Sequence, residues 1–82
     1  MTNQTTTHRT LSAIAREIDS DWKNVYFGAR PYLNAMYSLG TINDKYGFDD
    51  ATSIVRYFLG NANTWRGETA KRVKSELKLM IK

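Results

Sequence analysis

The sequence has no cysteine and only one histidine, and these shortages exclude several kinds of functional site. Without cysteine the chain can form neither a disulfide nor a thiolate metal site. His8 is the only histidine and lies in a polar stretch, so a nucleophile–base pair of the usual kind cannot be built. Neither a phosphate-binding loop nor a dinucleotide fingerprint is present. The sequence therefore predicts a protein that is not an enzyme and needs no cofactor or metal ion.

Long apolar runs are missing as well. No run approaches the roughly 18 residues that a membrane-spanning helix requires. Residues 1–7 are polar and lack the apolar core of a secretion signal. The absence of cysteine also fits a reducing compartment. We therefore expect a cytoplasmic protein whose partners do not include a membrane.

The length of 82 residues allows a single domain. Residues 1–9 are rich in threonine, asparagine and glutamine and offer nothing to bury, so they are predicted to form a disordered N-terminal tail. Residues 10–82 are predicted to form one helical domain.

Apolar residues recur at helical spacing in two clear stripes. One stripe begins at Leu11, behind Thr10, whose hydroxyl can accept a hydrogen bond from a free amide of the first turn. The other begins at Ala51, behind Asp50, which can cap its helix in the same way. These patterns predict helices near residues 10–22 and 49–61.

Turn residues indicate where two further helices begin and end. Pro31 is favoured at the first position of a helix, and Gly40 can end that helix in a left-handed conformation. Thr64 can cap the last helix, and the residues between Gly40 and Asp49 are expected to form a short connector. The predicted helices lie near residues 31–39 and 65–80.

Four amphipathic helices with short connections predict an all-α fold, a small bundle of four short amphipathic helices. Residues at the centres of the apolar stripes are expected to form one contiguous core, and Tyr37 is expected to face it. The core residues predicted at the stripe centres are Ile14, Ile18, Ile54, Val55, Phe58, Val73 and Leu77. Trp22 is also predicted to be a core residue, and Leu33 and Met36 are expected to face inwards.

Positive charge is concentrated in the last segment. Residues 1–65 carry six basic and six acidic side chains, whereas residues 66–82 carry six basic and two acidic ones. Four of the lysines fall within an arc of about 80° on the last helix, next to its apolar face, and are expected to be exposed. This basic face predicts attraction to nucleic-acid phosphates or to an acidic protein; the alternative is a solvated surface that only keeps the protein in solution. The four residues are Lys71, Lys74, Lys78 and Lys82.

Aromatic residues offer a second candidate site. The ten aromatic side chains are many for so small a core. Tyr26 and Phe27 precede Arg30 at one helix junction, and Trp65 precedes Arg66 at another, and these residue types anchor protein interfaces. The alternative is that the rings close the ends of the helical bundle.

Several stretches of the chain resemble small uncharacterised proteins encoded by phages, prophages and other mobile elements. The resemblance covers about residues 11–78 and implies an accessory protein in the cytoplasm of a bacterial host, without implying any site residue. The stretches are Ile14–Ile18, Asp21–Asn24, Tyr26–Ala29, Pro31–Leu33, Tyr57–Leu59, Asn61–Ala62 and Thr64–Ala70.

These observations predict a non-catalytic, phage-type accessory protein that binds a protein partner, which is a host or phage macromolecule or a second copy of the chain. The alternative is non-specific nucleic-acid binding through the basic C-terminal helix.

Overall fold

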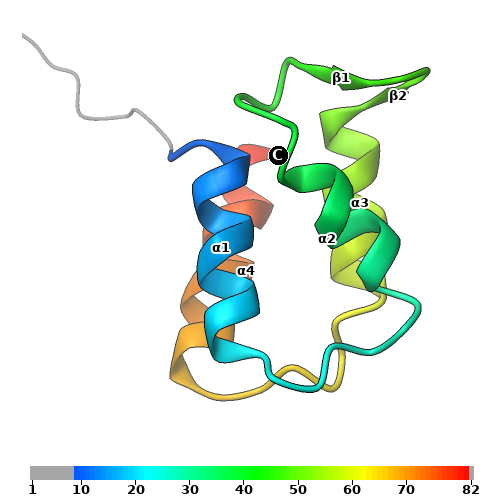
Figure 1. The fold of residues 1–82 in the computed structure, drawn as a ribbon. Coiled ribbons are helices and arrows are strands. Elements are labelled where there is room, and N and C mark those ends of the chain that lie inside the picture. The colour runs from blue at the N-terminus through cyan, green and yellow to red at the C-terminus, as the bar shows by residue number, and fades with distance from the viewer. Residues whose placement is uncertain (1–8, 82) are drawn as a thin grey trace, which may run out of the picture.

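Four helices pack in a ring in which each helix contacts two neighbours. In the computed structural model, which describes residues 9–81, α1 (Leu11–Asp21) packs against α2 (Arg30–Met36) and α4 (Glu68–Met80). Helix α3 (Ala51–Gly60) packs against the same two helices (Figure 1). The fold is therefore mostly helical, as predicted. The predicted tail covers residues 1–9. Residues 1–8 lie outside the described residues, and Arg9 is described below.

A small β-hairpin corrects the prediction of an all-α fold. Strand β1 (Lys45–Tyr46), in the expected connector, pairs antiparallel with β2 (Asp49–Asp50), which occupies the predicted start of the third helix. The hairpin lies at one end of the domain, with both ends of the described chain (Figure 1). The connections 22–29 and 61–67 lie together at the opposite end, which we call the loop end.

The two clear apolar stripes form helices within one or two residues of the predicted limits. Thr10 caps α1 by accepting a hydrogen bond from the Ala13 amide, and Asp50 caps α3 by accepting one from the Ser53 amide. The bond from Ser53 also holds the pKa of Asp50 below its ordinary value. Both predicted caps are confirmed, because a short polar side chain ahead of an apolar stripe satisfies an amide that the helix leaves free.

All of the predicted core residues are buried. They form one cluster with side chains from the connecting segments, among them Ala29, Leu39, Ala62 and Trp65. Tyr37, in contrast, was wrongly expected to face the core. Its ring is exposed, and its hydroxyl donates a hydrogen bond to Asp19 on α1.

The end of α2 differs from the prediction. The helix ends at Met36, and Gly40 does not have the left-handed conformation expected of a helix cap. Instead the Gly40 carbonyl accepts a hydrogen bond from the Leu11 amide, and its amide donates to the Asp44 carboxylate. Gly40 therefore links the start of α1 to the base of the hairpin.

The start of α4 also differs from the prediction. The helix begins at Glu68, three residues after the predicted start, and its N-cap is Gly67 with φ of 111°. A side chain is strained at such a φ, so glycine is the residue that allows this entry into the helix. Thr64 lies in the preceding turn and does not cap α4. Within residues 9–81, every helix is too short and too polar to span a bilayer.

Candidate functional site

The cations of the last helix, among them lysines predicted to form one exposed face, divide into three groups with different environments. Arg72 belongs to an ion-pair network, Lys74 stabilises the loop end, and Lys71 and Lys78 are exposed to solvent. Lys82 lies outside the described residues. The division matters because only the exposed cations are free to attract a partner.

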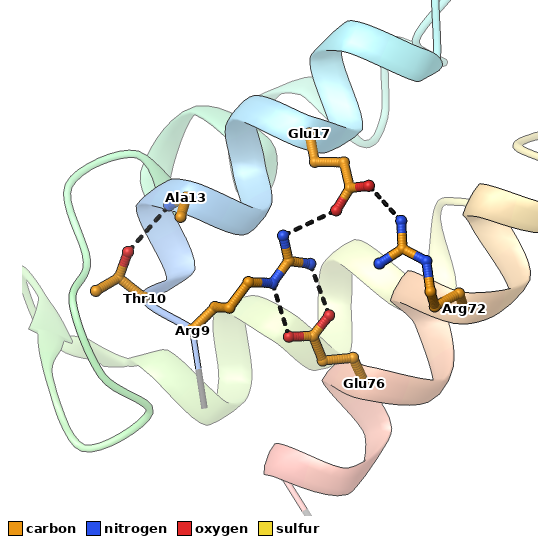
Figure 2. A network of polar contacts seen from close by, with 6 residues as sticks. All are labelled: Arg9, Thr10, Ala13, Glu17, Arg72 and Glu76. Atoms are coloured by element: carbon orange, nitrogen blue, oxygen red, sulfur yellow. Dashed lines mark hydrogen bonds and ion pairs between the residues drawn. The ribbon is translucent and has the colours of Figure 1, made fainter. Parts of the chain in front are cut away.

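Arg72 belongs to an ion-pair network that joins α4 to α1 (Figure 2). It contacts Glu17, and the other Glu17 oxygen lies 2.9 Å from Nη1 of Arg9. Arg9 also donates to both oxygens of Glu76, over 2.7 and 3.0 Å. Arg72, and then Arg9, hold the pKa of Glu17 below its ordinary value against the opposing effect of partial burial. Arg9 was expected to lie in the disordered tail; in the structure it instead ties the start of the domain to α4.

Lys74 is not the free surface cation that was predicted. Its ammonium group donates to the carbonyl oxygens of Ala62 and Trp65, each over 2.7 Å, and lies 5.9 Å from the centre of the Trp65 ring. Partial burial lowers the pKa of Lys74, and the nearby charges of Lys78 and Arg66 lower it further. Lys74 therefore holds the loop end against α4, and replacing it is expected to affect stability.

A depression of about 480 Å³ opens beside the start of α4. Trp65 and Ala70 line it and are buried, so they form its floor. Its rim consists of exposed or partly buried charged side chains, of which only Glu68 is acidic. We call this the basic depression; its rim residues are Arg66, Glu68, Lys71 and Lys74.

The exposed cations near the basic depression lack acidic partners within residues 9–81. Arg66, Lys71 and Lys78 take part in none of the ion pairs there. Lys78 lies one helical turn beyond Lys74, close enough for its charge to lower the pKa of Lys74. The basic depression is therefore a surface where positive charges repel one another, and an anionic group would relieve that repulsion.

Trp65 was expected to anchor an interface, but its side chain is only 2% exposed. Its ring stacks on Trp22 with centroids 5.8 Å apart, and both rings meet Phe58 edge-on. Its indole nitrogen donates to Asp21 over 2.8 Å. Trp65 thus closes the core at the loop end, which is the alternative role predicted from the sequence for the aromatic rings.

Arg30 is also engaged within the domain. Its guanidinium donates to both oxygens of Asp19, and Tyr37 donates to the same carboxylate over 2.6 Å. Burial raises the pKa of Asp19, but the bonds from Arg30 and Tyr37 outweigh it and leave the pKa below its ordinary value. Arg30 therefore fastens α2 to α1 and is not placed to bind a partner.

Tyr26 and Phe27 remain exposed, as a partner-binding pair requires. Phe27 is 81% exposed, and the two rings contact each other with centroids 4.9 Å apart. Tyr26 lines a second, smaller pocket with Asn61 and Asn63, separate from the basic depression. Tyr26 and Phe27 thus form a surface of the loop end that is separate from the basic depression of Arg66 and Lys71.

Sequence reasoning missed the most exposed aromatic residue. Phe48 is fully exposed at the tip of the β-hairpin, and Tyr46 beside it is about half exposed. The available signal was Gly47 between two aromatic residues, since glycine in a two-residue loop is typical of a hairpin turn. Strands of two residues are too short to show alternation, so the tip was not recognised.

The side chains that could ligate a metal ion are scattered over the described part of the chain. Within residues 9–81, no three histidine, cysteine, aspartate or glutamate side chains come close enough together to hold a metal ion.

Comparisons of the chain with protein families, with characterised proteins and with solved structures find no match. The resemblance to phage-encoded proteins therefore stays a prediction.

Proposed function

We propose that this protein is a non-catalytic binding module that docks on an acidic segment of a protein partner through the basic depression. The observation that supports this most is the convergence of Arg66, Lys71 and Lys74 around a buried apolar floor. Trp65 and Ala70 are almost completely covered, so the apolar contact that the site offers comes mainly from the aliphatic parts of the surrounding arginine and lysine side chains, with their charges at the edge.

Charge pairing elsewhere in the domain strengthens the proposal. Glu17, Asp19 and Glu76 are each engaged by an arginine, so they do not neutralise the exposed cations of α4. Arg66, Lys71 and Lys78, in the segment that carries the charge excess of the sequence, consequently take part in none of the ion pairs within residues 9–81. A partner steered by charge should approach this side of the domain first.

Nucleic-acid binding is the second candidate, and the exposed rings of Tyr26 and Phe27 favour it. Exposed aromatic rings near cations are the combination that binds single-stranded nucleic acid by stacking. Within residues 9–81, however, only Arg66, Lys71 and Lys78 of the last segment are free cations, and the rings do not line the basic depression. A footprint of three phosphates gives weak binding, with a salt slope of about −2 for a single strand.

Fluorescence anisotropy with two labelled probes tests the proposal. One probe is a peptide with a phenylalanine between two pairs of aspartates, and the other is an oligothymidylate. We expect the peptide to bind and the Arg66→Glu/Lys71→Glu variant to weaken its binding about tenfold or more at low salt. The matched control is Arg16→Glu/Arg56→Glu, which makes the same charge change at exposed positions outside the basic depression.

Salt separates the two candidates. Peptide binding should persist in part from about 50 mM to about 200 mM salt, because the phenylalanine contact does not depend on counterion release. Equal weakening by both double variants would show that net charge alone attracts the peptide and would overturn the proposal. Preferential binding of the oligothymidylate, lost on Phe27→Ala, would favour nucleic acid instead.

A further inference from the structure

The β-hairpin is firmly held at its base. Lys45 pairs with Asp50 and Tyr46 with Asp49 across the two strands. The Asp44 carbonyl accepts a hydrogen bond from the Ala51 amide over 2.9 Å, and its carboxylate accepts from the amides of Gly40 and Thr41. These bonds fix the hairpin between the end of α2 and the start of α3.

The tip of the hairpin, in contrast, takes no part in the core. Phe48 is fully exposed, and neither Phe48 nor Tyr46 packs against the core cluster. Gly47 has φ of 64°, a conformation that lets the chain reverse in a two-residue loop. Phe48 and the half-exposed Tyr46 leave aromatic surface open on a support fixed by backbone hydrogen bonds, so another molecule can contact these rings without rearranging the hairpin.

The charge of the tip is opposite to that of the basic depression. Asp44, Asp49 and Asp50 outnumber Lys45 along the hairpin, and Asp49 follows Phe48 directly. Asp49 takes part in no ion pair within residues 9–81. A phenylalanine next to free acidic charge is the kind of segment that an apolar floor with a cationic rim accepts.

One copy of the chain cannot bring these two surfaces together. The hairpin lies at one end of the domain and the start of α4 at the other (Figure 1). The principal extents of the domain are 40 × 32 × 20 Å, and the helices between the two ends are packed on a common core. Contact between the tip and the depression therefore requires two molecules.

We propose that the hairpin tip of one copy docks in the basic depression of a second copy. This rests on the proposed function, because it names a second copy of the chain as the partner that fills that site. Phe48 lies in the depression against the aliphatic parts of its rim cations, above the covered side chains of Trp65 and Ala70, and Asp49 meets Arg66 and Lys71. The contact is head-to-tail, so each added copy leaves one tip and one depression open, and chains of copies grow with concentration. An interface this small gives weak association.

Sedimentation equilibrium of the full chain tests this inference. At low salt, from about 10 µM to about 1 mM, the weight-average mass should rise from 9.4 kDa past the mass of a dimer without levelling off. Phe48→Ala and Arg66→Glu/Lys71→Glu should each remain monomeric. Leu79→Ala removes another exposed apolar side chain, on α4, and should associate like the parent protein.

Mixing the two monomeric variants gives the sharpest outcome. Phe48→Ala retains an intact depression, and Arg66→Glu/Lys71→Glu retains an intact tip. Together they should form a complex of one copy each, which cannot grow further. A parent protein that stays monomeric at the highest concentration, a mass that stops at a dimer, or a mixture that stays monomeric would overturn the inference.

The peptide probe distinguishes failure of this inference from failure of the proposed function. In one outcome, Phe48→Ala binds the acidic peptide with the affinity of the parent protein, but neither the parent nor any variant self-associates. The basic depression then has a different protein partner, and only the inference is wrong. If the parent protein neither binds the peptide nor self-associates, both are wrong.

Discussion

The two ends of the domain use their aromatic residues in opposite ways. At the loop end, Trp22, Phe58 and Trp65 pack ring against ring, and the polar edge of Trp65 is bonded to Asp21. At the hairpin end, Phe48 projects into solvent from a support fixed by backbone hydrogen bonds. Aromatic content alone thus says little about binding. What decides the role of a ring is whether the fold supplies neighbours that bury it.

The largest effect on stability is expected at the loop end. Trp65→Ala removes a buried ring that contacts two others and leaves the Asp21 carboxylate without its indole donor, so unfolding should become easier by about 3–5 kcal/mol. That is a large share of the roughly 5–15 kcal/mol that stabilises a domain. Urea denaturation followed by circular dichroism measures it. Phe27→Ala, at an exposed position of the same end, is the control and should lie within about 0.5 kcal/mol of the parent.

A moderate effect is expected for Lys74. Lys74→Met keeps the length of the side chain but leaves the carbonyl oxygens of Ala62 and Trp65 without their donor, which should cost about 1–2 kcal/mol. Lys71→Met removes the same charge from an exposed neighbour and should be nearly neutral. Equal denaturation midpoints for the two variants would contradict the structural role assigned to Lys74.

Acid is expected to weaken the contacts of α1 with α2 and α4. The pKa values of Glu17 and Asp19 are lowered in the folded protein, so below their ordinary values, about 4.3 and 3.9, the unfolded chain binds more protons than the folded one. The stability that these carboxylates contribute is present above about pH 5 and is lost as pH falls through the lowered pKa values. Melting temperatures measured between about pH 6 and about pH 2 follow this loss of stability.

A matched pair of variants assigns this acid sensitivity to its source. Glu17→Gln should lower the melting temperature at neutral pH and make the acid limb shallower, because Glu17 no longer titrates. Glu68→Gln changes an acidic side chain that takes part in no ion pair within residues 9–81 and should keep the parent pH profile. An unchanged acid limb for Glu17→Gln would show that the network around Arg9 contributes little.

The smallest effect on stability is expected at the hairpin tip. Phe48→Ala removes a side chain that is already fully exposed, so the free energy of unfolding should change by less than about 0.5 kcal/mol. Urea denaturation of Phe48→Ala, measured together with Trp65→Ala, compares the contributions of the two ends of the domain directly. A loss of more than about 1 kcal/mol would mean that Phe48 packs within its own domain.

Helices with strong periodicity and a polar cap were predictable from the sequence. The apolar stripes that follow Thr10 and Asp50 form α1 and α3, because the helical periodicity and the capping residue both favour a helix at the same place. The start of α4 was missed because Thr64 and Gly67 are both acceptable at a helix start, and the choice depends on how Trp65 enters the core. The hairpin was missed because two-residue strands carry no periodic signal.

The candidate site was predictable in composition but not in arrangement. Counting charges located Arg66 and Lys71 on the last segment, and both line the basic depression. Counting could not show that Lys74 is bonded to two carbonyl oxygens, because those carbonyls belong to a loop that only the fold brings over the helix. Nor could it show that Glu17, 55 residues before Arg72, would pair with it.

The central claim is that the basic depression is where this protein binds an acidic partner. The most direct measurement is a titration of the ¹⁵N-labelled protein with the acidic phenylalanine peptide, followed by two-dimensional NMR at low salt. The account predicts that the largest shifts fall on the backbone amides of residues 65–74 and on the Trp65 indole. Shifts confined to Tyr26 and Phe27, or small shifts spread evenly over the domain, would contradict it.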